Sequence, residues 1–147
     1  MRASSFSRST PPNDELRLVP VKAEGIRQPE LRRRAKEGGA TAVTKLYLAV
    51  LGVEEVGLLS VDVHVKDFYI YEIYVVRRCR RNRIGSYLLA QAERIAVEHG
   101  HPVAQLKPHA LDPEHVGRDV LVEWYRGCGY VPISQGDSEF WLKRLAI

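Results

Sequence analysis

The sequence predicts a single α/β (α+β) domain around a mixed, mostly antiparallel sheet with flanking helices. Three segments of strand character follow one another between residues 46 and 76, and this succession favours an antiparallel meander. The hydrophobic period then changes to that of a helix from Ile84, and a short apolar strand, Val103–Leu106, comes next. Because a strand, a helix and a second strand in succession form a parallel pair, a β-α-β unit is expected to complete the sheet.

Two segments before residue 46 are expected to be ordered. Residues 16–21 alternate apolar and other side chains, and Pro20 restricts this strand to the edge of a sheet because proline cannot donate a ladder hydrogen bond. Pro29 is typical of the first position of a helix, and Gly38 and Gly39 are typical of its end. The first connection is therefore predicted to contain one short basic helix.

The three central strands are predicted from residue type and alternation. Residues 46–51 form a continuous apolar run of strand length, and residues 56–65 end in valines that alternate with polar residues. Residues 68–76 are rich in aromatic and β-branched side chains. Residues 52–55 are expected to form the first turn.

The second half of the chain alternates helices and strands. Five apolar residues recur at helical spacing, namely Ile84, Leu88, Ala92, Ile95 and Ala96. Gly100 is expected to end this helix, and a polar loop, residues 109–115, follows the strand after it. A further helix is predicted over about residues 116–126, and residues 140–145 are predicted to form the last strand.

Length and composition agree with one ordinary globular domain, expected over residues 15–147. A chain of 147 residues buries roughly 68–70% of its unfolded surface. Hydrophobic residues make up 45% of it, and no apolar run reaches the roughly 18 residues of a membrane span. Residues 1–14 are polar and lack the apolar stretch of a secretory signal, so we predict a disordered tail. A cytoplasmic protein without a membrane partner is expected.

The charged residues and the cysteines indicate which kinds of ligand the chain can bind. The formal charge is +4, and five arginines fall within residues 77–83 while three more are adjacent at 32–34, which suggests a local anionic partner. Cys79 and Cys128 are too few for a disulfide framework or a zinc site, so no metal is expected. Because Cys79 stands among cations, a stabilised thiolate is predicted for it.

The segment 77–86 joins a predicted strand to a predicted helix. A helix N-terminus carries unpaired N–H groups and a partial positive charge, so such a junction can bind an anion. Gly85 permits close approach of the backbone, Ser86 adds a hydroxyl, and arginines form charge-assisted hydrogen bonds to phosphate. The residues therefore suit a pyrophosphate, although a solvated basic surface or a nucleic-acid patch has the same composition.

The stretch EIYVVRRCRRNRIGSYLL resembles motif A of the GNAT superfamily of N-acetyltransferases, whose pattern is R/Q-x-x-G-x-G/A. Arg80 stands at the R/Q position and Gly85 at the final glycine. EWYRGCGYVPI resembles motif B of the family, and FWLKRL resembles its terminal strand. The resemblance extends from Leu46 to the C-terminus and implies a single-domain GNAT-like fold in which two parallel strands splay apart.

The resemblance implies that acetyl-CoA is the cosubstrate. Backbone groups of Val75 and Arg77 would bind the pantetheine arm, and N–H groups between Arg81 and Ser86 would bind the pyrophosphate. The full set of expected cofactor-binding residues is Val75, Val76, Arg77, Arg80, Arg81, Asn82, Arg83, Ile84, Gly85 and Ser86. Arg83 replaces the middle glycine of the pattern. We expect right-handed helical geometry at Arg83, and we expect its positive charge to offset the less close approach of the phosphate to the backbone. Arg118 stands where the family commonly has an Asn before motif B, so that contact is not carried over.

The resemblance also assigns the chemistry. Tyr125 matches the motif B tyrosine and is the expected general acid toward the coenzyme A sulfur, although a half-buried aromatic residue fits the same helix position. Glu72 is the expected general base for the amine, although strand alternation also permits it to face solvent. The predicted reaction is direct attack of a primary amine on acetyl-CoA in a ternary complex.

The partners expected from this hypothesis are acetyl-CoA and an unidentified amine, and a homodimer is left open. Two alternatives stay open: a non-catalytic domain of the same fold that binds coenzyme A as a regulator, and a nucleic-acid-binding domain. The second is ranked last because no aromatic residues are interleaved with the basic runs.

Overall fold

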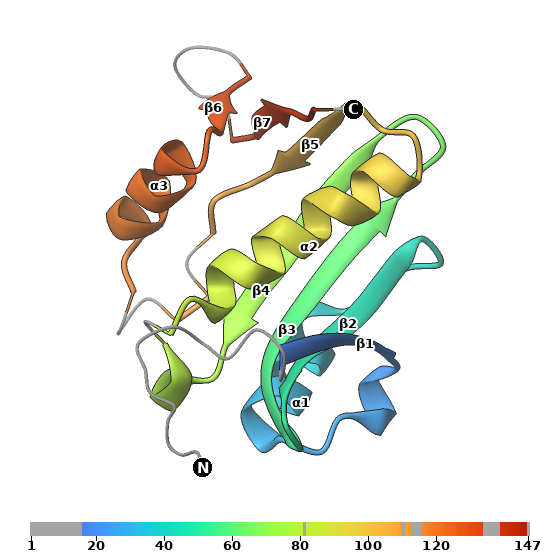
Figure 1. Ribbon diagram of the computed structural model, residues 1–147, viewed down its shortest axis with the longest axis vertical. Coiled ribbons are helices and arrows are strands. Elements are labelled where there is room, and N and C mark those ends of the chain that lie inside the picture. Colours follow the sequence, from blue (N-terminus) through green and yellow to red (C-terminus); the bar gives the residue numbers. More distant parts are fainter. Residues whose placement is uncertain (1–15, 81, 110, 113–115, 134–138, 147) are drawn as a thin grey trace.

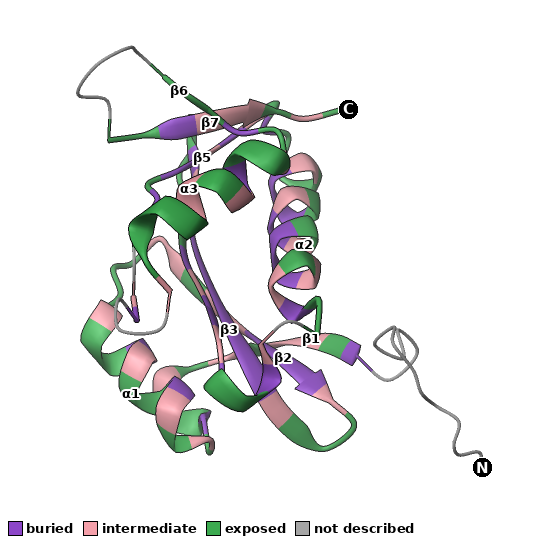
Figure 2. Cartoon of the chain, turned by 90° about the vertical axis from the view of Figure 1, so that its left-hand side faces the viewer, coloured by how far each residue is buried: buried purple, intermediate pink, exposed green. Residues whose placement is uncertain are grey.

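The chain is described by a computed structural model that covers residues 16–146 except residues 81, 110, 113–115 and 134–138. The predicted tail, residues 1–14, therefore lies outside the described residues. The described chain forms one seven-stranded mixed sheet in the order β1-β2-β3-β4-β5-β7-β6 (Figure 1). Helices α1 and α2 lie on opposite faces of this sheet (Figure 2).

The first four strands form the predicted antiparallel meander. They are β1 (Leu16–Val21), β2 (Thr44–Leu51), β3 (Glu54–Val63) and β4 (Phe68–Val75). Strand β1 is at the edge of the sheet, as Pro20 requires. The register of β3 on β4 shifts between Ser60 and Val61, so that Ser60 faces Glu72 whereas Val61 faces Ile70. This bulge leaves Tyr71 as the extra residue of β4.

Helix α1 (Pro29–Gly38) begins and ends where proline and glycine predicted. The Gln28 side chain caps it by accepting a hydrogen bond from the Leu31 N–H at 2.8 Å. Gly39 follows with φ of 73°, a conformation that glycine adopts without strain. The helix buries Leu31 and Ala35 against the sheet. A 3-10 turn before it, η1 (Ala23–Gly25), was not predicted because three residues are too short for a periodic signal.

Helix α2 (Ile84–Glu98) packs on the other face and buries the apolar residues that the spacing predicted. Gly57 of β3 lies beneath it, and a Cβ at this position would be 2.9 Å from Leu88 Cδ1. The missing side chain therefore lets the helix approach the sheet closely. Gly100, with φ of 81°, follows the helix as expected.

Strands β4 and β5 (Val103–Leu106) are parallel and pair over a short length only. The paired residues are Tyr69 with Gln105 and Ile70 with Leu106. Beyond Ile70, β4 continues to Val75, and the described residues show no strand beside it on that side. The predicted splayed pair is thereby confirmed.

The remaining elements close the β5 side of the sheet. Helix α3 (Arg118–Gly127) matches the predicted helix within two residues, and β7 (Trp141–Arg144) lies within the predicted last strand. Strand β6 (Val131–Pro132) was not predicted because two residues carry no detectable alternation. No helix in the described part of the chain is both long and apolar enough to cross a membrane.

Candidate functional site

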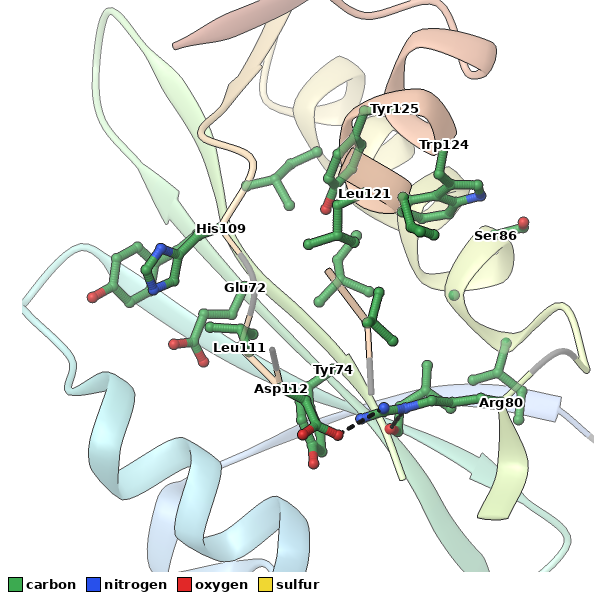
Figure 3. A pocket seen from close by; sticks show the side chains of 18 of the residues that line it. Glu72, Tyr74, Arg80, Ser86, His109, Leu111, Asp112, Leu121, Trp124 and Tyr125 are labelled. Atoms are coloured by element: carbon green, nitrogen blue, oxygen red, sulfur yellow. Dashed lines mark hydrogen bonds and ion pairs between the residues drawn. The ribbon is translucent and has the colours of Figure 1, made fainter. Parts of the chain in front are cut away.

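A cavity of about 330 Å³ opens where β4 leaves β5, and we call it the α2 cavity. Its walls are the end of β4, the first turn of α2, one face of α3 and the segment that connects β5 to α3. Figure 3 shows Tyr125 of α3, Ser86 of α2 and Glu72 of β4 around this space. The splay of the parallel strands therefore produces a pocket of ligand size directly at a helix N-terminus.

The N-terminus of α2 presents main-chain donors to the α2 cavity. In the first intrahelical hydrogen bond of α2, the Tyr87 N–H donates to the Arg83 carbonyl at 3.0 Å. The N–H groups before Tyr87 therefore have no acceptor within the helix. Ile84, Gly85 and Ser86 carry such groups, and all three line the cavity. An anion placed here would meet both these donors and the helix dipole.

Arg83 departs from the expected conformation. It has φ of 64° and ψ of 14°, which is left-handed, so the prediction of right-handed helical geometry is wrong. The chain turns sharply after the 3-10 helix η2 (Arg77–Cys79) before α2 begins, and the left-handed residue makes that turn. A left-handed residue costs little only when it is glycine, which explains the glycine in the family pattern at this position.

Gly85 faces the α2 cavity. A Cβ on Gly85 would lie 3.8 Å from the Trp124 ring and 4.0 Å from Val75 Cγ2. Both distances are ordinary contacts, so the fold itself tolerates a side chain. A longer side chain would instead extend across the space between α2, α3 and β4.

Most of the loop arginines are held by carboxylates. Arg80 Nη1 lies 2.8 Å and Arg77 Nε 2.9 Å from one oxygen of Asp112, which is only 8% exposed. Arg78 pairs with Glu54 at 2.7 Å. Sequence reasoning missed Asp112 because it is one acidic residue in a polar loop, more than 30 positions from its partners. The positive charge that the loop offers to an anion is therefore smaller than the arginine count suggests.

Two main-chain groups expected to bind pantetheine already have partners. Arg80 Nε donates to the Val75 carbonyl at 2.9 Å, and its guanidinium carbon lies 5.1 Å from the centre of the Tyr74 ring. The Arg77 N–H donates to Glu30 Oε2 at 3.1 Å. Use of these groups by a ligand therefore requires that Arg80 and Glu30 release them.

The other predicted cofactor residues divide into two groups. Val75, Arg80 and Arg83 line the α2 cavity together with the first turn of α2. Val76 is fully buried and its N–H donates to Val56 O. Arg77 and Asn82 do not line this cavity, and Arg81 lies outside the described residues.

Tyr125 reaches the α2 cavity from α3. It is 8% exposed, and its ring packs on Trp124 and Tyr130 at centroid distances of 4.8 and 5.9 Å. Burial raises the pKa of the Tyr125 phenol above its usual value, so the group keeps its proton at neutral pH. It can therefore act as a proton donor inside the cavity.

Glu72 is buried rather than solvent-facing, with 7% of its surface exposed. Arg34 of α1 holds it through Nη2 to Oε2 at 3.0 Å and Nε to Oε1 at 3.4 Å. Burial raises the pKa of Glu72, and the hydrogen bond and charge of Arg34 partly oppose this rise. The carboxyl group is thus a stronger base than an exposed glutamate.

Glu72 also borders a second cavity of about 630 Å³, which we call the α1 cavity. This cavity lies beside the end of α1 and is lined by residues of α1, β3, β4 and the segment after β5. Glu72, Tyr71 and His109 line both cavities. A group bound in the α1 cavity can therefore approach the α2 cavity at Glu72.

Cys79 differs from its sequence-based prediction. It is 7% exposed, and burial raises the pKa of its thiol despite the nearby Arg78, so the expected stabilised thiolate is wrong. Desolvation outweighs the charge because Arg78 is itself paired with Glu54. Within the described residues, no three His, Cys, Asp or Glu side chains gather as a metal site.

Comparison with known proteins identifies the family. The sequence profile of the Acetyltransferase (GNAT) family matches residues 28–130, and the chain belongs to this family. No curated protein matches the chain.

Solved structures share the fold at low sequence identity. A GNAT family acetyltransferase from Elizabethkingia anophelis with acetyl-CoA bound has a TM-score of 0.60 and 16% identity, and the match covers 90% of this chain and 99% of that one. The IAA acetyltransferase from Bacillus cereus has a TM-score of 0.63 and 16% identity, covering 88% and 99%. The PaiA N-acetyltransferase from Thermoplasma acidophilum in complex with coenzyme A has a TM-score of 0.60 and 13% identity, covering 88% and 98%.

Proposed function

We propose that this chain is an acetyl-CoA-dependent N-acetyltransferase that acetylates a primary amine by direct attack in a ternary complex. The observation that carries the proposal is the position of Glu72 in a wall shared by two cavities, one of which contains the Tyr125 hydroxyl and the N-terminus of α2. A base between an acceptor space and a cofactor space is what acyl transfer between two bound substrates needs.

The α2 cavity suits the cosubstrate. Its main-chain donors at Ile84, Gly85 and Ser86 can bind the pyrophosphate, and Arg83 adds positive charge beside them. The space left by Gly85 in front of Trp124 would receive the pantetheine arm. The bound acetyl-CoA of the Elizabethkingia anophelis relative and the coenzyme A of the Thermoplasma acidophilum relative support this assignment.

The reaction forms a C–N bond and breaks the C–S bond of the thioester. Glu72 accepts the proton that the amine loses, directly or through water, and its raised pKa favours this role. Tyr125, which is protonated at neutral pH, donates its proton to the departing sulfur. The Arg34 pair keeps the Glu72 carboxylate in place at the junction of the two cavities.

Ligand-induced stabilisation tests the cofactor assignment. Acetyl-CoA at 100 times its Kd should stabilise the fold by about 2.7 kcal/mol, which corresponds to about 5–10 °C in Tm for a domain of this size. Gly85→Glu should fold with a Tm near that of wild type, because a Cβ fits there, and should lose this shift. No shift of the wild-type Tm at millimolar acetyl-CoA would overturn the proposal.

Turnover tests the two catalytic assignments. Release of coenzyme A thiol across an amine panel should fall about 100-fold in Tyr125→Phe and in Glu72→Gln. Both variants should keep the acetyl-CoA shift in Tm. Unchanged turnover in either variant would remove that residue from the mechanism, and binding without turnover on any amine would identify a coenzyme A-binding regulator instead.

A further inference from the structure

We infer that the α1 cavity selects an amine that carries a second cationic group, with Asp62 as the counterion of that group. This inference rests on the proposed function, because it assigns the acceptor of the same reaction. Its basis is a carboxylate without a cationic partner among the described residues, beside aromatic rings, in a cavity that Glu72 also lines.

The α1 cavity has the size and walls of a small-molecule site. Its volume of about 630 Å³ lies within the range of ordinary ligand pockets. Tyr69, Tyr71 and Phe140 supply apolar surface, and three carboxylates line the same space, namely Glu37, Asp62 and Glu72. Aromatic surface combined with negative charge suits an organic cation.

The arginine and lysine side chains of the α1 cavity are already engaged with carboxylates. Arg34 pairs with Glu72 at 3.0 Å and with Glu37 at 3.3 Å. Lys107 pairs with Glu139, which does not itself line the cavity. The lining is therefore left with an excess of negative charge.

Asp62 is where that excess lies. Its Oδ1 accepts a hydrogen bond from the Thr44 hydroxyl at 2.6 Å, and Thr44 carries no charge. Among the described residues, no Lys or Arg pairs with Asp62. The second carboxylate oxygen therefore remains available to a ligand cation.

An aromatic cluster lies beside Asp62. Tyr69 faces Asp62 across the β3–β4 ladder. The Tyr69 ring lies 5.8 Å from His64 and 5.9 Å from Phe140, edge to face in both cases. An ammonium group held by Asp62 would gain cation–π attraction from the Tyr69 ring.

The spacing between Asp62 and Glu72 limits the length of the ligand. Glu72 faces Ser60 and Asp62 faces Tyr69, so the two acidic residues are two positions apart along β3 and, because of the bulge at Tyr71, three positions apart along β4. At a rise of about 3.3 Å per residue, this offset is about 7–10 Å along the strands. An alkyl diamine of a few methylenes can therefore place one nitrogen at Glu72 for acetylation while Asp62 binds the other.

The experiment compares two isosteric amines, cadaverine and n-hexylamine, in which a methyl group replaces the second ammonium. Wild type should acetylate cadaverine with a kcat/KM about tenfold above that of n-hexylamine. Asp62→Asn should lower kcat/KM for cadaverine about tenfold and leave the n-hexylamine value unchanged. Asp67→Asn is the matched control, because it removes the same charge from a residue outside the cavity lining, and it should change neither value.

Three results overturn the inference: preference of wild type for n-hexylamine, an equal effect of Asp62→Asn on both amines, or acetylation of other amines but neither of these. Calorimetric binding of cadaverine separates this inference from the proposed function. If cadaverine binds, Asp62→Asn weakens the binding and no amine is acetylated, the cation site stands and the proposed function fails. If cadaverine does not bind while other amines are acetylated, the proposed function stands and the cation site fails.

Discussion

Replacing Arg83 by glycine should stabilise the fold. Arg83 is left-handed, with φ of 64°, a conformation that costs a residue with a Cβ about 1–2 kcal/mol. Glycine removes this cost, but it lowers the free energy of unfolding by about 0.5–1 kcal/mol because it makes the unfolded chain more flexible. Within the described residues the Arg83 side chain forms no ion pair or hydrogen bond, so removing it costs little stability.

The expected net gain in the free energy of unfolding is about 0.75 kcal/mol, the difference between the midpoints of these two ranges. For a domain of this size such a gain raises Tm by about 1–4 °C. Urea unfolding followed by circular dichroism, with acetyl-CoA absent, measures it. Arg83→Ala is the matched control, because it removes the same charge and keeps the Cβ.

Arg83→Ala should therefore lie within about 0.5 kcal/mol of wild type. An equal gain in Arg83→Ala and Arg83→Gly would assign the effect to relief of repulsion among the loop arginines. A loss of stability in Arg83→Gly would refute the strain at this position.

Three further outcomes follow from the site. Gly38→Ala should lower the free energy of unfolding by about 1–3 kcal/mol, because the new Cβ would lie 2.6 Å from Glu72 Oε2. Gly117→Ala is the control and should cause no such loss, because the space around Gly117 is open. Equal urea midpoints for the two variants would contradict this expectation. Arg34→Met should raise the pKa of Glu72 further, because the hydrogen bond and the charge of Arg34 lower it. The low-pH limb of the kcat/KM profile, where the base becomes protonated, should therefore move to higher pH. A limb that does not move would exclude Glu72 as the titrating base. Cys79 should resist iodoacetamide at pH 7 in the folded protein, and rapid alkylation detected by mass spectrometry would refute its raised thiol pKa.

The elements that sequence predicted best are those whose signals are local. Helix α1 begins at Pro29 and ends at Gly38, since proline and glycine act on the backbone of their own position. Helix α2 was recognised because five apolar residues repeat at the helical period, and all five are buried. The two-residue β6 has neither kind of signal, and it exists through its pairing with Leu142 and Trp141.

The site was only partly predictable because much of it depends on distant partners. The position of Gly85 and Ser86 at a helix N-terminus follows from the local pattern of strand and helix. The burial of Glu72 does not, since it depends on Arg34, which is 38 positions away on another element. The conformation of Arg83 was predicted wrongly because the turn from η2 into α2, rather than helix propensity, determines it.

The pairing of Arg80 and Arg77 with Asp112 changes how the arginine-rich loop should be understood. Two guanidinium groups and one buried carboxylate leave about one positive charge, and that assembly ties the β4–α2 junction to the segment before α3. These arginines therefore stabilise the walls of the α2 cavity. Among the described residues, attraction for an anion is left mainly to the α2 N-terminus and to Arg83, which forms no ion pair there. The charge of Arg83 lies beside the main-chain donors, whereas a glycine at this position would supply only close approach of the backbone.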